Sequence, residues 1–238
     1  MKNKFHLPDV GMSFFFLTIT LALTSWIASI YGSGEVQNLL SAEGIRWMLG
    51  HMVENYITTP SLSVMMFLFM GTGVWVRSGL YDASVRLFHK GKLLSHKERR
   101  AMIWAFSAGI VYGLTILATT LIPVNILQSV TGTWVNSPFS KGFIFLFSLG
   151  IGLAGIVYGY TSDRFRRMKD TFDAMSYHIA HYASYWVGLF FVVQFFSSLE
   201  YTHMDNWLNI PESVVNVFFH FFSYVPLLTI FIQRNLTK

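Results

Sequence analysis

The sequence contains no cysteine and is poor in charge. Of its 238 residues, 12% are Asp, Glu, Lys or Arg, about half the usual share in soluble domains. The absence of cysteine excludes a disulfide framework and any metal site built on thiolates. The shortage of charge excludes the surface of an ordinary soluble domain, which is covered largely by charged side chains.

The chain has long apolar runs instead. Hydrophobic residues make up 53% of the sequence and aromatic residues 17%. The runs recur at the length of about 20 residues that a helix needs to cross a bilayer. None shows the period-two alternation of a barrel strand, so the runs are helical. We predict an all-α integral membrane protein, one polytopic domain over residues 1–238. The six predicted transmembrane helices are 11–31, 61–83, 101–122, 141–161, 176–199 and 213–233.

An amphipathic helix is predicted between the first two spans, at about 41–56. Ser41 suits its N-cap and Pro60 ends the segment. Six apolar residues share one face at helical spacing, namely Ile45, Met48, Leu49, Met52, Val53 and Tyr56. We expect this helix to lie on the outer membrane surface or to pack on the helix bundle.

Basic residues predict the orientation. They gather in 86–100, in 164–169 and at both termini, whereas the opposite loops carry most of the acidic residues. The positive-inside rule then places the N- and C-termini in the cytoplasm. The net charge of +5 is thus a topology signal and not a nucleic-acid footprint.

Polar residues inside the predicted spans are the candidate intramembrane sites: His178, His181, Gln194, Asn216 and His220. His178 and His181 share a helix face, which would suit a proton relay or a metal pair. The alternative is an interfacial polar patch. The other three either hydrogen-bond a neighbouring helix or line a pathway.

No complete catalytic or metal-binding constellation is visible. A metal site needs more ligands than two histidines, and no acidic residue lies deep in any span, which argues against autonomous proton coupling. We therefore expect no enzyme activity, no metal and no cofactor. Two close-approach motifs, Gly109-x-x-x-Gly113 and Gly155-x-x-x-Gly159, either pack helices within the chain or drive dimerisation.

The stretch GTGVWVRSGL at 71–80 ends an apolar run with Arg77, a residue placed to snorkel at the interface. It resembles a Gly-x-Gly-x-x-Glu-basic-Ser-Gly-Leu pattern of the AbgT family, the p-aminobenzoyl-glutamate transporters. Gly71, Gly73, Arg77, Ser78, Gly79 and Leu80 fit it, and Val76 departs from it. Further stretches resemble the family: the start of the first span, VQNLLSAEGIRWML at 36–49, GIVYGY at 155–160 with Tyr158 and Gly159, and the helix that follows, with Met175, Phe190, Phe191, Gln194 and Phe195.

The resemblance implies a bacterial inner-membrane transporter built from an inverted repeat with two re-entrant hairpins. Residues 101–140 stand where the first hairpin would bring an acidic sodium-site residue, and they contain no Asp or Glu. The second hairpin would lie beyond the sixth span. We therefore expect a shortened relative that keeps the family's scaffold. It would act in solute movement as a homo-oligomer or with a partner membrane protein. The alternative is a non-transporting scaffold or anchor subunit of a larger complex.

Overall fold

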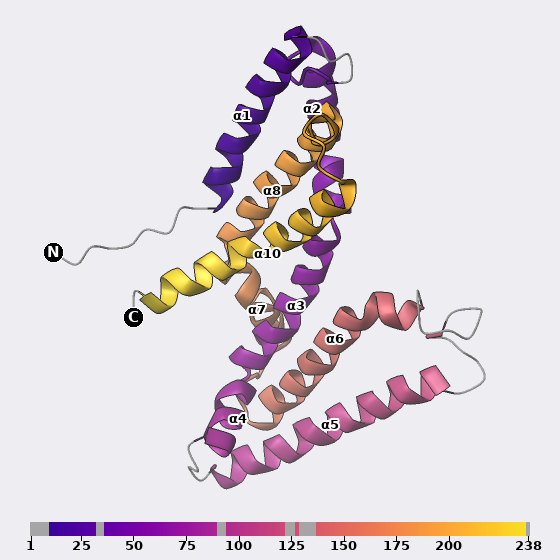
Figure 1. Ribbon diagram of the computed structural model, residues 1–238. Coiled ribbons are helices and arrows are strands. Elements are labelled where there is room, and N and C mark those ends of the chain that lie inside the picture. The colour runs from indigo at the N-terminus through magenta and orange to yellow at the C-terminus, as the bar shows by residue number, and fades with distance from the viewer. Residues whose placement is uncertain (1–9, 32–35, 90–93, 122–126, 129–136, 237–238) are drawn as a thin grey trace, which may run out of the picture. The chain divides into compact units, whose positions relative to one another are not determined.

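The computed structural model describes residues 10–31, 36–89, 94–121, 127–128 and 137–236, and every regular element in these ranges is a helix (Figure 1). The helices are α1 (Val10–Tyr31), α2 (Ala42–Thr58), α3 (Pro60–Arg77), α4 (Leu80–His89), α5 (His96–Leu121), α6 (Pro138–Thr161), α7 (Met168–His181), α8 (Ala183–Thr202), α9 (Met204–Trp207) and α10 (Glu212–Leu236). They form two compact units. Unit 1 holds residues up to Ser63 and from Tyr182 onward, and unit 2 is Val64–His181. The basic N-terminal residues and the loop residues 90–93 lie outside the described ranges.

Three described helices are long and apolar enough to cross a membrane: α1, α6, and α5 as far as Thr120. The pairs α2 with α3 and α7 with α8 pass the same test when each pair is taken together. Helix α10 is apolar but shorter over Glu212–Leu228. The prediction of an all-helical membrane protein is therefore confirmed, and the count of six spans stays a prediction.

Two predicted spans are interrupted. The span 61–83 is wrong as a single helix, because α3 ends at Arg77 and Gly79 adopts a left-handed φ of 81° before α4 begins. The span 176–199 is also interrupted, because Tyr182 has φ −105° and ψ 33°, outside the helical region. Helix α6 begins three residues before the predicted start, where the hydroxyl of Ser137 accepts a hydrogen bond from the N–H of Ser140 at 3.1 Å.

The predicted amphipathic helix is α2, and in unit 1 it runs antiparallel along α8. The hydroxyl of Ser41 caps it, accepting from the N–H of Gly44 at 3.0 Å. Near one end Trp47 stacks on Tyr201, with ring centroids 4.2 Å apart. Near the other end the Tyr56 hydroxyl donates to the carbonyl of Trp186 at 3.0 Å. Helix α2 therefore packs on another helix, and its placement at the outer membrane surface stays a prediction.

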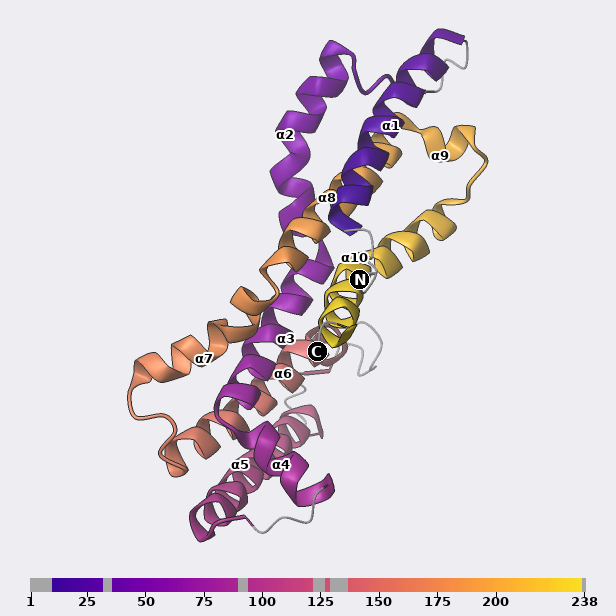
Figure 2. The same ribbon diagram turned by 90° about the vertical axis from the view of Figure 1, so that its left-hand side faces the viewer.

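Aromatic rings form the core of unit 1, where α1, α8 and α10 pack together (Figures 1 and 2). The Phe14 ring of α1 lies 6.0 Å from that of Phe196 on α8 and 5.2 Å from that of Phe222 on α10, centroid to centroid. Gly188 of α8 leaves room for Pro226 of α10, whose Cβ would lie 3.0 Å from a Cβ at position 188. Ring contacts of this kind supply dispersion energy between helices in lipid.

In unit 2, α5 and α6 lie side by side in antiparallel directions (Figures 1 and 2). The Tyr112 hydroxyl of α5 donates to the carbonyl of Leu146 on α6 at 2.9 Å. At one end Arg86 of α4 pairs with Glu98 of α5 at 2.6 Å, and Lys97 pairs with Asp163, just after α6. The basic stretches that begin at 86 and 164 therefore share one end of the unit, as the predicted topology requires.

Candidate functional site

Helix α3 passes between α6 and α7 in unit 2, and two glycines make this close passage. A Cβ at Gly71 would overlap the carbonyl oxygen of Ser148 on α6. A Cβ at Gly73 would lie 2.6 Å from the carbonyl oxygen of Ala174 on α7. Residues two apart are separated by about 200° around a helix, so the two glycines face opposite neighbours. The GTG sequence therefore lets two helices approach the α3 backbone from both sides.

Beside this passage lies a set of polar side chains, here called the α3–α7 cluster: Thr72, Arg77, Tyr177, His178 and His181. The Thr72 hydroxyl donates to the carbonyl of Leu68 in its own helix at 2.7 Å. The same hydroxyl oxygen lies 2.9 Å from Nδ1 of His178. A hydroxyl has one proton to give, so while it donates to Leu68 the Nδ1–H of His178 donates to Thr72. The imidazole is thus tied to α3.

Tyr177, His181 and Arg77 make further ring contacts within the α3–α7 cluster. The ring centroids of Tyr177 and His181 are 5.7 Å apart, and those of His178 and His181 are 6.4 Å apart. The guanidinium of Arg77 lies 5.5 Å from the centroid of the Tyr177 ring, which is cation–π geometry. The two histidines fall in the last turn of α7, where the helix dipole favours positive charge. The arrangement brings imidazoles, a phenol and a guanidinium together at the end of a helix.

The chemistry open to this cluster is hydrogen bonding and proton exchange. Within the described ranges, no group of three or more His, Cys, Asp or Glu side chains could hold a metal ion. The rings of Tyr177, His178 and His181 are half-buried, and Arg77 is exposed. The proton-relay interpretation and the polar-patch interpretation of His178 and His181 are both compatible with these contacts.

The other predicted polar residues belong to unit 1 and do not form one site. Gln194 of α8 is buried, and its amide donates to the carbonyl of Met52 on α2 at 2.9 Å. Asn216 and His220 lie on the exposed side of α10, where Nδ1 of His220 contacts the carbonyl of Asn216 at 2.7 Å within the same helix. Only Gln194 of these three thus makes a described contact between helices.

Comparison with known proteins identifies the family. The model described as the AbgT putative transporter family matches residues 3–92 and 86–232. The chain belongs to the AbgT family. A p-aminobenzoyl-glutamate transport protein of Escherichia coli (strain K12) is 31% identical to this AbgT chain over 103 residues, which are 39% of the chain and 19% of the relative.

A solved structure shares the fold. The crystal structure of the YdaH transporter of Alcanivorax borkumensis matches the AbgT chain with a TM-score of 0.73, covering 84% of this chain and 72% of that one, at 16% identity. The chain is thus a member of a transporter family, and its several apolar helices agree with a multi-pass protein of the bacterial inner membrane.

The family-motif residues of this AbgT chain serve helix packing and a turn. Ser78 is fully buried, and its hydroxyl donates to the carbonyl of Trp75 at 3.1 Å. A Cβ at Gly79 would overlap the guanidinium of Arg164, so the turn after α3 is covered by the loop that follows α6. Tyr158 is fully buried among small and aliphatic side chains of α4 and α5. A Cβ at Gly159 would overlap the ring of Phe165.

The two close-approach motifs differ. A Cβ at Gly155 would lie 3.0 Å from Cγ1 of Val74, so this glycine meets α3 within the chain. At Gly109 and Gly113 a Cβ would have no described atom within 4 Å. The first motif therefore serves packing inside unit 2, and the second leaves an open stretch on α5.

Sequence reasoning missed two residues of the α3 passage. Thr72 binds His178, and the buried Ser148 of α6 donates to the carbonyl of Phe67 on α3. Each is a small polar residue on an apolar helix, in the immediate neighbourhood of glycines. That combination is the signal that could have identified them, because small polar residues often hydrogen-bond across close helix contacts in membranes.

Proposed function

We propose that this AbgT chain takes part in solute movement across the inner membrane as a homo-oligomer or together with a partner membrane protein. The two family matches, which together run from residue 3 to residue 232, carry the proposal. The two matches overlap at residues 86–92, which begin in the last turn of α4. A shortened family member, with a segment missing near these residues, would give a match in two blocks.

The proposed need for further subunits rests on the absence of acidic residues from residues 101–140. Residues 101–140 carry no Asp or Glu, and the described residues contain no group that could hold a metal ion. In transporters built from inverted repeats, sites for coupling ions lie near the bilayer midplane at interrupted helices. A second chain that supplied them would complete the pathway around the scaffold helices described here.

An anionic aromatic conjugate is the substrate class we propose. The E. coli relative is named for p-aminobenzoyl-glutamate, and its alignment covers 19% of that protein. The α3–α7 cluster offers Arg77 and two histidines as groups able to attract a carboxylate. This substrate assignment depends on the proposed transport function.

The test begins with the intact assembly. The protein is extracted from native membranes in mild detergent and its mass is measured, then the purified assembly is placed in vesicles. We expect a mass larger than one chain and uptake of labelled p-aminobenzoyl-glutamate above that of empty vesicles. A solitary chain without flux contradicts the proposal. A stable assembly with an unrelated membrane protein and no flux supports the scaffold alternative instead.

A further inference from the structure

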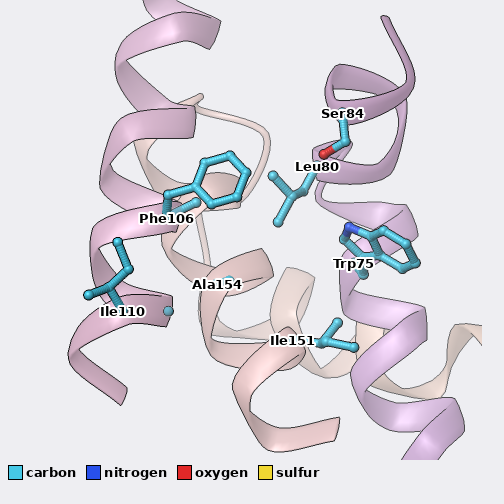
Figure 3. Close-up of a pocket in the computed structure, with 9 residues that line it drawn as sticks. Trp75, Leu80, Ser84, Phe106, Ile110, Ile151 and Ala154 are labelled. Carbon is cyan, nitrogen blue, oxygen red and sulfur yellow. The ribbon is translucent and has the colours of Figure 1, made fainter. Parts of the chain in front are cut away.

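A cavity of about 370 Å³ lies in unit 2 where α3, α4, α5 and α6 meet (Figure 3). Its lining comprises Trp75, Leu80, Ser84, Ala105, Phe106, Gly109, Ile110, Ile151 and Ala154. The Ser84 hydroxyl and the Trp75 indole N–H are the polar side-chain groups of this lining, and the rest is hydrocarbon or aromatic. An apolar cavity of this size, many times the roughly 30 Å³ of one water molecule, suits an apolar ligand better than water.

The cavity adjoins the part of α5 that faces lipid. Phe106 and Ile110, which line it, are 51% and 62% exposed. In a helix that crosses a membrane, exposed apolar side chains contact acyl chains. Gly109 lies between them, and the absence of any described atom within 4 Å of a Cβ there leaves this wall open. Gly109, which meets no neighbouring helix within unit 2, thus forms part of a recess in this wall.

Charge defines one end of the recess. Arg99 lies seven residues before Phe106 and eleven before Ile110, so all three fall on one stripe of α5. Arg99 is exposed, and its Cα lies about 10 Å along the helix axis from the Cα of Phe106. At the same end, Leu87 and Phe88 of α4 are 46% and 73% exposed. A short amphipathic helix with exposed apolar side chains beside arginines is typical of the headgroup level.

We infer that this recess binds one anionic phospholipid of the bilayer, with an acyl chain in the α3–α4–α5–α6 cavity and the phosphate at Arg99. Ser84 and the Trp75 indole would meet the ester oxygens near the top of the chain. The positive-inside orientation predicted for this end brings it to the leaflet where anionic headgroups attract basic segments. The inference does not depend on the proposed transport function.

The first test is native mass spectrometry of the purified, delipidated protein titrated with phosphatidylglycerol or with phosphatidylcholine. We expect one tightly retained phosphatidylglycerol and a preference of about fivefold over phosphatidylcholine, the contribution of one basic residue near a membrane surface. Arg99→Gln should abolish the preference while leaving chain binding in place. Arg100→Gln, the same charge change off the stripe, is the matched control and should keep the preference.

The cavity itself is tested by filling it. Gly109→Leu should displace the retained lipid, whereas Gly113→Leu, one turn further along α5 and outside the lining, should not. Ala154→Leu fills the cavity from α6 and repeats the test if the first variant fails to fold. Equal lipid retention by Gly109→Leu and the wild type overturns the acyl-chain assignment. Equal affinity of the wild type for both lipids overturns the assignment of an anionic phospholipid.

Tryptophan fluorescence gives an independent readout in membranes. Phosphatidylglycerol with brominated acyl chains should quench Trp75, and the quenched fraction should fall in Trp75→Phe and in Gly109→Leu. A quenched fraction unchanged by both variants contradicts occupation of the cavity.

Discussion

The two units hold their helices together in different ways. In unit 1, α1, α8 and α10 meet through interlocking phenylalanine rings around Phe14. In unit 2, α3 meets α6 and α7 through glycines that bring backbones together. Lipid offers no hydrophobic drive for helix association, so contact area must come from large rings or from close backbones. One chain can thus hold its helices together by both means, large rings in unit 1 and close backbones in unit 2.

The largest effect is expected from removing a ring in unit 1. Phe14→Ala would leave a cavity between α1, α8 and α10 and should cost about 3–5 kcal/mol of unfolding free energy. Phe16→Ala on the same helix, where the ring is 57% exposed, is the control and should cost far less. Both are measured by reversible unfolding in mixed micelles. Equal losses would show that Phe14 is not a core residue.

The second effect tests the close passage in unit 2. Gly71→Ala should cost about 1–3 kcal/mol, because its Cβ would push against backbone atoms of Ser148 that cannot change rotamer. Gly113→Ala makes the same change where the space is open, and should be neutral or slightly stabilising. Thermal unfolding of the purified proteins measures both changes. Equal unfolding midpoints for the two variants would show that close backbone contact at Gly71 does not stabilise unit 2, which is the difference proposed between the units.

The third effect, the loss of one hydrogen bond between helices, is smaller and should be similar in the two units. Gln194→Leu removes the hydrogen bond to Met52 in unit 1, and Thr72→Val removes the contact with His178 in unit 2. Each should cost about 0.6–1.7 kcal/mol, the range for polar contacts between membrane helices. Asn216→Leu, on the exposed side of α10, serves as the control. Chemical unfolding in micelles measures all three, and a near-zero value for both test variants would refute the assigned contacts.

The smallest effect concerns an exposed ion pair in unit 2. The hydrogen bond from Lys97, together with its charge, lowers the pKa of Asp163 below the ordinary value of 3.8. Because the pKa of Asp163 is lower in the folded than in the unfolded state, the ion pair stabilises the fold above the unfolded-state pKa. This stabilisation is lost as the pH falls through the folded-state pKa. Asp163→Asn should therefore flatten the stability profile in this acid range. The difference from wild type should vanish in high salt, since both side chains are more than half exposed.

The sequence predicted those features that have a local chemical signal. Ser41 was identifiable as a cap because a hydroxyl before an amphipathic stretch satisfies a free N–H. The break at Tyr182 was missed because neither Gly nor Pro marks it. The exposed side of Asn216 and His220 was also missed. Asn216, His220 and Ser223 share one stripe of α10, but periodicity cannot say whether a polar stripe in a membrane protein meets a neighbouring helix or is exposed.

The sequence predicts some residues of the candidate site but not the contacts between them. Helical spacing placed His178 and His181 on one face, and the GTG stretch was singled out by its glycines. The partner of His178 was beyond prediction, because Thr72 is 106 residues away and the contact depends on how α3 and α7 pack. Contacts between residues far apart in the chain leave little trace in a single sequence.

The two glycines of α3 also have a mechanical consequence. At this level α3 presents bare backbone to α6 on one side and to α7 on the other. Side chains can absorb a small displacement by changing rotamer, but peptide groups cannot. A shift of α7 at Ala174 would therefore be transmitted through the thickness of one backbone to Ser148 of α6. Helix α3 thus acts there as a stiff spacer, and its two faces move together.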